Sequence, residues 1–147
     1  MDFQTACEYG RLETAKLLFT LGLADVHAYE DVAFRWACGN GHLETAKWVH
    51  TLGGVNIHAE NDEAFLFACV GGHLEVVKWL VSFGHVDIHL YDDFAFRCAC
   101  AGGNLEMAKW VLSLGGINVH AENDEAWPFR NCEMVVVPGR CERTCQR

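Results

Sequence analysis

The chain has 147 residues, half of them apolar, and carries a formal net charge of −9. No run approaches the roughly 18 consecutive apolar residues of a membrane span, so a membrane protein is not expected. Residues 1–4 contain neither a basic region nor the start of an apolar stretch, so a secreted protein is not expected either. These exclusions predict an intracellular, cytoplasmic protein whose length suits one domain.

The charge is unevenly distributed along the chain. Residues 1–127 carry seven Lys and Arg against eighteen Asp and Glu, giving −11, whereas residues 128–147 carry four Arg against two Glu, giving +2. An acidic body repels the phosphates of nucleic acids, so nucleic-acid binding is not expected. A basic or apolar protein partner fits this charge better.

One phrase recurs along the chain at a fixed step of 31 residues: GRLETAKL from Gly10, GHLETAKW from Gly41, GHLEVVKW from Gly72 and GNLEMAKW from Gly103. A fixed step without insertions indicates that one supersecondary unit is repeated and stacked. Units of this size cannot bury their own apolar faces, so neighbouring units must cover them. We predict repeats at about 1–27, 28–58, 59–89 and 90–120, with the start of a fifth at 121.

Each repeat contains two apolar segments with helical spacing, which in the second repeat predict helices at roughly 31–39 and 43–52. Asp31, Asp62, Asp93 and Asp124 stand where an N-cap acceptor is wanted, and glycines follow both helices as C-caps. Between the helix pairs we expect extended arms with protruding tips, at 24–31, 55–62, 86–93 and 117–124. The first repeat has no arm before it and opens directly on a helix at Phe3.

The segment GHLEVVKWL at 72–80, followed by a glycine, a Val-Asp-Ile segment and a turn, resembles the second half of an ankyrin repeat. Four such copies cover residues 1–127. The T-P-L-H start of that family is missing and the period is shorter than the usual ~33 residues, so the projecting hairpin is expected to be stunted or a loop. This variant resembles the ankyrin arrays of giant DNA viruses and amoebae, and a viral chain would reside in the host cytoplasm.

The resemblance implies an all-α solenoid of stacked antiparallel helix pairs joined by projecting loops or short hairpins. It also implies a non-enzymatic module that binds a protein through a concave face, formed by the tips and the first helices. Tyrosines among carboxylates suit a basic, partly apolar partner, although acidic tips also serve solubility alone. The predicted protein-binding residues are Glu8, Tyr9, Tyr29, Glu30, Arg35, Asn40, Glu60, Asn61, Leu66, Val70, Tyr91, Asp92, Arg97, Glu122 and Asn123.

Other repeated side chains receive structural interpretations. We expect one cysteine per repeat to pack in the core, one tryptophan to pack between repeats, and one Glu/Lys pair to lie on the surface of each second helix. One histidine per arm is expected to bond the backbone of the adjoining arm, because repeats ~10 Å apart cannot share a zinc ion held at ~2.1 Å. These residues are Cys7, Cys38, Cys69 and Cys100; Trp48, Trp79 and Trp110; Glu13/Lys16, Glu44/Lys47, Glu75/Lys78 and Glu106/Lys109; and His27, His58, His89 and His120.

The register ends in the C-terminal region. Trp127 falls in register with Phe3 and its equivalents, so a fifth first helix is expected from Asp124, but no further repeat follows. Residues 128–147 are a divergent cap, a disordered tail or foreign sequence, with short strand character at 134–139. They leave two alternative functions open: an adaptor that recruits cellular machinery through this tail, or a small zinc or redox protein using Cys132, Cys141 and Cys145. The main prediction is a monomer without catalytic residues, cofactor or metal.

Overall fold

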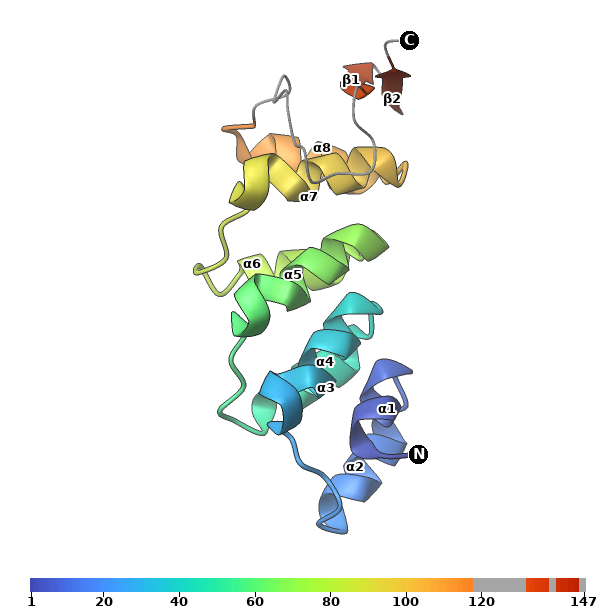
Figure 1. Ribbon diagram of the computed structural model, residues 1–147, viewed down its shortest axis with the longest axis vertical. Helices are drawn as coiled ribbons and strands as arrows, with labels where there is room; N and C mark the ends of the chain where they lie inside the picture. The colour runs from blue at the N-terminus through green and yellow to red at the C-terminus, as the bar shows by residue number, and fades with distance from the viewer. Residues whose placement is uncertain (118–131, 138–139, 146–147) are drawn as a thin grey trace. The chain divides into compact units, whose positions relative to one another are not determined.

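The computed structural model describes residues 1–117, 132–137 and 140–145, the strand residues by their backbone only, and it divides into unit 1 (Met1–Val86) and unit 2 (Asp87–Arg147). Unit 1 consists of three antiparallel helix pairs (Figure 1). The pairs are α1 (Phe3–Glu8) with α2 (Leu12–Thr20), α3 (Ala28–Gly39) with α4 (Leu43–Thr51), and α5 (Ala59–Gly71) with α6 (Leu74–Val81). These helices confirm the predicted all-α fold of stacked pairs.

Local sequence determines where α1 begins and where the chain turns between the two helices of a pair. The side chain of Asp2 accepts a hydrogen bond of 2.8 Å from the backbone N–H of Thr5 and caps α1, which begins at Phe3 as predicted. This bond stabilises the carboxylate and lowers the pKa of Asp2. The α1–α2 and α3–α4 turns contain Gly10 and Gly41 at φ values of +65° and +78°, which favour glycine.

The core of unit 1 lies where the first helices α1, α3 and α5 pack side by side and against their second helices. Phe3, Phe34 and Phe65 are at most 1% exposed, and the repeat cysteines Cys7 and Cys38 are fully buried, as predicted. Burial raises the pKa of Cys7 to about 12, so this thiol stays protonated and unreactive.

The predicted packing of tryptophans between repeats is confirmed within unit 1. The ring of Trp48 lies 6.2 Å from that of Phe3 and 5.9 Å from that of Phe19, both in the preceding repeat. Trp79 makes the equivalent contact with Phe34 at 6.1 Å. Each tryptophan therefore covers the apolar side chains that the repeat before it cannot bury.

The tips of unit 1 are left-handed turns. Tyr29, Glu30 and Asp31 have φ values of 51°, 55° and 59°, and residues 60–62 repeat the conformation before regular helix begins. A left-handed residue costs about 1–2 kcal/mol, and Asp and Asn accept it better than most side chains. The predicted extended arms are thus loops that close in a compact turn, and no strand is assigned to residues 24–27 or 55–58.

The aspartates at these turns and the arm histidines have different partners from those predicted. Asp31 does not act as the expected helix cap; its carboxylate accepts bonds from the backbone N–H of Asn56 at 2.8 Å and from His27 Nδ1 at 2.7 Å. His58 bonds Asp62 in the same way, at 2.5 Å. The histidines therefore bond the carboxylate four residues further along the chain instead of the adjoining backbone, because the left-handed turn brings that carboxylate back beside the ring.

Unit 2 contains a fourth helix pair, α7 (Leu90–Ala101) with α8 (Leu105–Leu114). His89 Nδ1 lies 2.5 Å from Asp93 Oδ1, which repeats the His–Asp contact of unit 1. Two strands, β1 (Cys132–Val137) and β2 (Arg140–Cys145), form an antiparallel hairpin in which Val137 pairs with Arg140. Strand character at 134–139 was expected, but the returning strand was not. The predicted fifth helix, with Asp124 and Trp127, and His120 lie outside the described residues.

Candidate protein-binding surface

The surface of unit 1 has two sides with different chemistry. The term inner face denotes the two tips at 29–30 and 60–61, the exposed side chains of α1, α3 and α5, and the residues Tyr9 and Asn40 that follow α1 and α3. The outer side is the exposed surface of α2, α4 and α6. Most of the predicted binding residues within unit 1 belong to the inner face.

The outer side is balanced in charge. On each second helix a lysine pairs with the glutamate three residues before it: Lys16 with Glu13 at 2.9 Å, Lys47 with Glu44 at 3.2 Å, and Lys78 with Glu75 at 3.1 Å. The glutamates are largely exposed, so the predicted solvated surface pairs are confirmed. Such pairs contribute only about 0.2–0.5 kcal/mol each, and they leave this side nearly neutral.

The surplus negative charge of unit 1 therefore lies elsewhere. Residues 1–86 contain five Lys and Arg against eleven Asp and Glu, giving −6. Three of the five cations are the paired lysines of the outer side, Arg35 pairs with Glu63, and Arg11 is exposed at the start of α2. The uncompensated carboxylates belong to α1, the arms and the tips.

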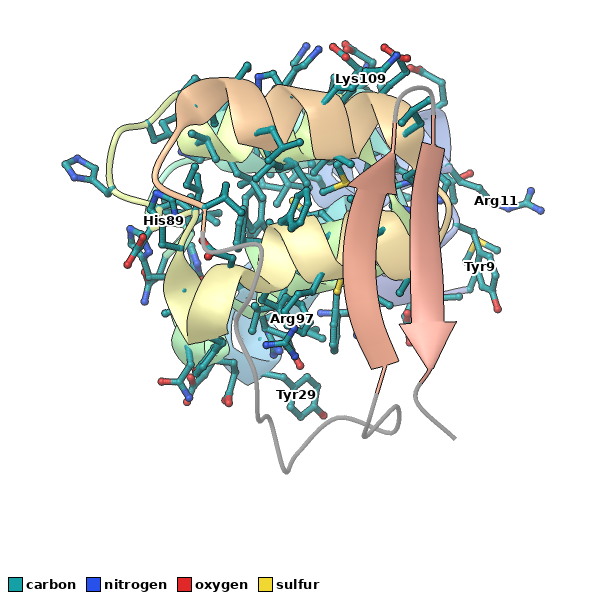
Figure 2. The ribbon with its side chains drawn as sticks, turned by 90° about the horizontal axis from the view of Figure 1, so that it is seen from above. Tyr9, Arg11, Tyr29, His89, Arg97 and Lys109 are labelled. Atoms are coloured by element: carbon teal, nitrogen blue, oxygen red, sulfur yellow. The ribbon has the colours of Figure 1, made fainter. Side chains whose placement is uncertain are left out.

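The tips carry exposed side chains. Tyr29 is 82% exposed and projects away from the helices (Figure 2). Glu30, Glu60 and Asn61 are exposed as well. In unit 2, Tyr91 is 52% exposed at the equivalent turn. The left-handed turn thus places the exposed side chains of Tyr29 and Glu30 at the start of α3, those of Glu60 and Asn61 at the start of α5, and that of Tyr91 at the start of α7.

The surface at the C-terminal ends of the first helices is more apolar than predicted. Of the predicted residues, Tyr9 and Val70 are 62% and 57% exposed, Asn40 is exposed, and Glu8 and Leu66 are half-buried. Two unpredicted aromatic side chains lie among them, namely Trp36 and Phe67 at 36% and 43% exposure. These two are 31 residues apart, so the repeat register that aligned the core phenylalanines contained the signal.

Arg35 has a structural role within unit 1. Its side chain is buried, forms an ion pair with Glu63 of the next repeat, and donates to the carbonyl oxygens of Tyr29 at 2.7 Å and Glu30 at 3.0 Å. Those carbonyls belong to the left-handed turn, so Arg35 holds the tip in place. Arg97 in unit 2 donates to the carbonyl of Tyr91 at 3.2 Å and lies on the opposite side of that unit from Lys109 (Figure 2).

Several predicted positions lie outside the described part of the molecule. They are Glu122, Asn123, the side chain of Asp92, and the side chains of Cys132, Cys141 and Cys145. Among the side chains that the structure does describe, no three His, Cys, Asp or Glu are placed to hold a metal ion. No helix in the same region is long and apolar enough to cross a bilayer.

Comparison with known proteins gives a consistent family assignment. A family model for ankyrin repeats, in three copies, matches residues 34–123, which is well over half of the chain. None of the curated proteins with which the sequence was compared matches it. The matched residues contain the later part of α3 and all of α4 to α8, whereas the first helix pair precedes the match. From its repeats, its fold and this match, the chain belongs to the ankyrin-repeat family.

Proposed function

We propose that this protein is a non-enzymatic binding module that recognises a basic protein surface through the inner face of its first helices and tips. Ankyrin repeats generally serve as protein–protein interaction modules and are typically not enzymes, which supports the class of function. The observation that carries the choice of surface is the charge difference between the two sides of unit 1. Paired lysines neutralise the outer side, while Glu30 and Glu60 are exposed at the tips of the inner face.

The exposed tyrosines support the same surface. Tyr9 and Tyr29 offer apolar contact area that ends in a hydroxyl, and each loses little side-chain entropy when it is ordered in an interface. Acidic neighbours such as Glu30 and Glu60 attract a basic partner and exclude an acidic one. The binding residues of this proposal are therefore those at the tips and along the exposed edges of α1, α3 and α5, with Arg35 as a support beneath them.

The test compares charge reversal on the two sides of unit 1. The inner variant carries Glu30→Lys and Glu60→Lys, and the outer variant carries Glu44→Lys and Glu75→Lys. Both change the net charge by the same amount, so a difference between them reports position and not total charge. Partners captured by the full-length protein are identified by mass spectrometry, and their dissociation constants are measured after purification.

We expect the inner variant to lose at least 10-fold in affinity and the outer variant to stay within about 2-fold. Wild-type binding should also weaken as salt is added, since charges near a surface are screened. Circular dichroism verifies that both variants keep their helicity. Equal losses in the two variants, or no loss in the inner one, would contradict the proposed surface.

A further inference from the structure

A hollow lies on the inner face of unit 1, at the C-terminal ends of α3 and α5. Its volume is about 320 Å³, at the lower end of the range for ligand pockets, which suits a single large side chain better than a whole small molecule. Its lining residues are Trp36, Gly39, Asn40, Phe67, Val70 and Gly71.

The repeat explains why this hollow is formed. Trp36 and Phe67 occupy the same register position in successive repeats, so their rings form two walls one repeat apart. Gly39 stands between them, and a Cβ there would lie 2.9 Å from the Cβ of Phe67. Gly71 leaves room for the ring of His73, whose Nε2 would lie 2.4 Å from an added Cβ. Gly39 and Gly71 thus line the hollow without side chains that would fill the space between the two rings.

The walls leave apolar area in solvent. Trp36, Phe67 and Val70 are 36%, 43% and 57% exposed and lie together, which is the arrangement of an interface centre and not of scattered surface residues. Asn40, another lining residue, has its side chain held on the helix end, because its Nδ2 donates to the backbone carbonyl of Trp36 at 3.0 Å.

The charges around the hollow restrict what binds there. Lys16, Lys47 and Lys78 are on the outer side, and Arg35 is paired with Glu63. In the repeat before the hollow, Glu8 and Tyr9 take the register positions of Gly39 and Asn40. At the other ends of α3 and α5, the tips present Glu30 and Glu60 in solvent. A segment bound in the hollow therefore has carboxylates near it in two directions: Glu8 in the preceding repeat, and the tip residues Glu30 and Glu60 at the other ends of α3 and α5.

We propose that the hollow takes one aliphatic or aromatic side chain from an extended protein segment in which Lys or Arg residues flank that side chain. The apolar side chain covers Trp36, Phe67 and Val70, while the flanking cations approach Glu8 on one side and the acidic tips on the other. The inference rests on the proposed function and adds to it the chemistry of the recognised segment.

The test uses four labelled 12-residue peptides against the full-length protein. The first has a central leucine flanked by lysines, the second replaces the leucine by serine, the third replaces the lysines by glutamates, and the fourth replaces them by serines. Fluorescence anisotropy gives the affinities. The indole N–H resonance of Trp36, assigned by its loss in Trp36→Phe, reports where the peptide binds.

The first peptide should bind at least 10-fold more tightly than each of the others and should shift the Trp36 indole resonance. Trp36→Ala and, as a milder second variant, Val70→Ser should each weaken it at least 5-fold. Leu23→Ala, which removes a more exposed apolar side chain away from the inner face, should not. Equal binding of all four peptides would overturn the inference. Unchanged binding of the first peptide to both Trp36→Ala and Val70→Ser would overturn it as well.

Two further outcomes separate this inference from the proposed function. If the Trp36 resonance depends on protein concentration without peptide, a second copy of the chain covers the hollow and the inference is wrong. If a captured partner loses affinity for the inner charge variant but not for Trp36→Ala or Val70→Ser, the proposed function stands and the inference fails. Loss in both sets of variants supports both.

Discussion

The inner face and the outer side of unit 1 arise from one repeat, yet they differ in how strictly the repeat is kept. On the outer side the Glu/Lys pair recurs unchanged in all three helix pairs. On the inner face the equivalents of Trp36 are Thr5 and Phe67, and those of Val70 are Gly39 and Glu8. Strict repetition reflects packing and solvation that every repeat needs, whereas a binding site must be unique and uses the positions that vary.

The largest effect is expected from Gly41→Ala, which disturbs the scaffold beneath the inner face. Gly41 has a φ of +78°, and a Cβ there would lie 2.4 Å from His73 Nδ1 of the next repeat. The left-handed backbone and the displaced ring together should cost about 2–4 kcal/mol in the free energy of unfolding. Urea denaturation followed by circular dichroism measures this loss.

Gly53→Ala is the matched control for that substitution. Gly53 has a φ of +88°, but nothing lies within 4 Å of an added Cβ. The control therefore carries only the backbone strain of about 1–2 kcal/mol. Equal destabilisation by the two substitutions would mean that the ring of His73 does not press on Gly41.

Asp31→Ala should have the next largest effect, since it removes the carboxylate that joins two repeats. The backbone N–H of Asn56 and the ring of His27 both lose their acceptor, and Ala tolerates the φ of +59° less well than Asp does. We expect a loss of about 2–3 kcal/mol. Asp31→Asn keeps an acceptor and a side chain suited to this backbone, so its loss should be smaller. The opposite order in urea denaturation would contradict the assigned role.

These contacts show which parts of the structure the sequence was able to predict. The 31-residue step was sufficient for the helix pairs and the buried cysteines, because periodicity reports which faces are covered. It was not sufficient for the tips, since Tyr29 and Glu30 are unusual at positive φ and the bonds from Arg35 to their carbonyls join residues five and six positions apart. The aromatic walls were missed because helical spacing alone cannot tell an exposed Trp36 from a buried one.

A pH effect of modest size is expected from His73. Burial lowers the pKa of its imidazole, with a contribution from nearby His42, although a bond with the Gly39 backbone partly opposes the shift. The unfolded chain therefore takes up this proton first as the pH falls through about 6.5, and stability declines on acidification. The urea concentration at the midpoint of unfolding should decrease as the pH is lowered from 7.5 to 5.5.

His73→Asn is the control for this pH effect, because the fourth repeat has Asn104 at the same position. The variant keeps a polar side chain but removes the titration. Its urea midpoint should depend less on pH than that of the wild type over the same window. Identical pH dependence in the two proteins would assign the effect to other groups.

The smallest effect is expected on the outer side, from Lys47→Ala. The ammonium of Lys47 lies 3.2 Å from the carboxylate of Glu44, and both side chains are well exposed. Water and salt screen such a pair, so the loss of stability should be about 0.2–0.5 kcal/mol. The substitution also makes the protein more acidic without altering the inner face, so partner affinity should change by less than about 2-fold. An affinity change as large as that of the Glu30→Lys and Glu60→Lys variant would mean that total charge, and not its position on the inner face, governs binding.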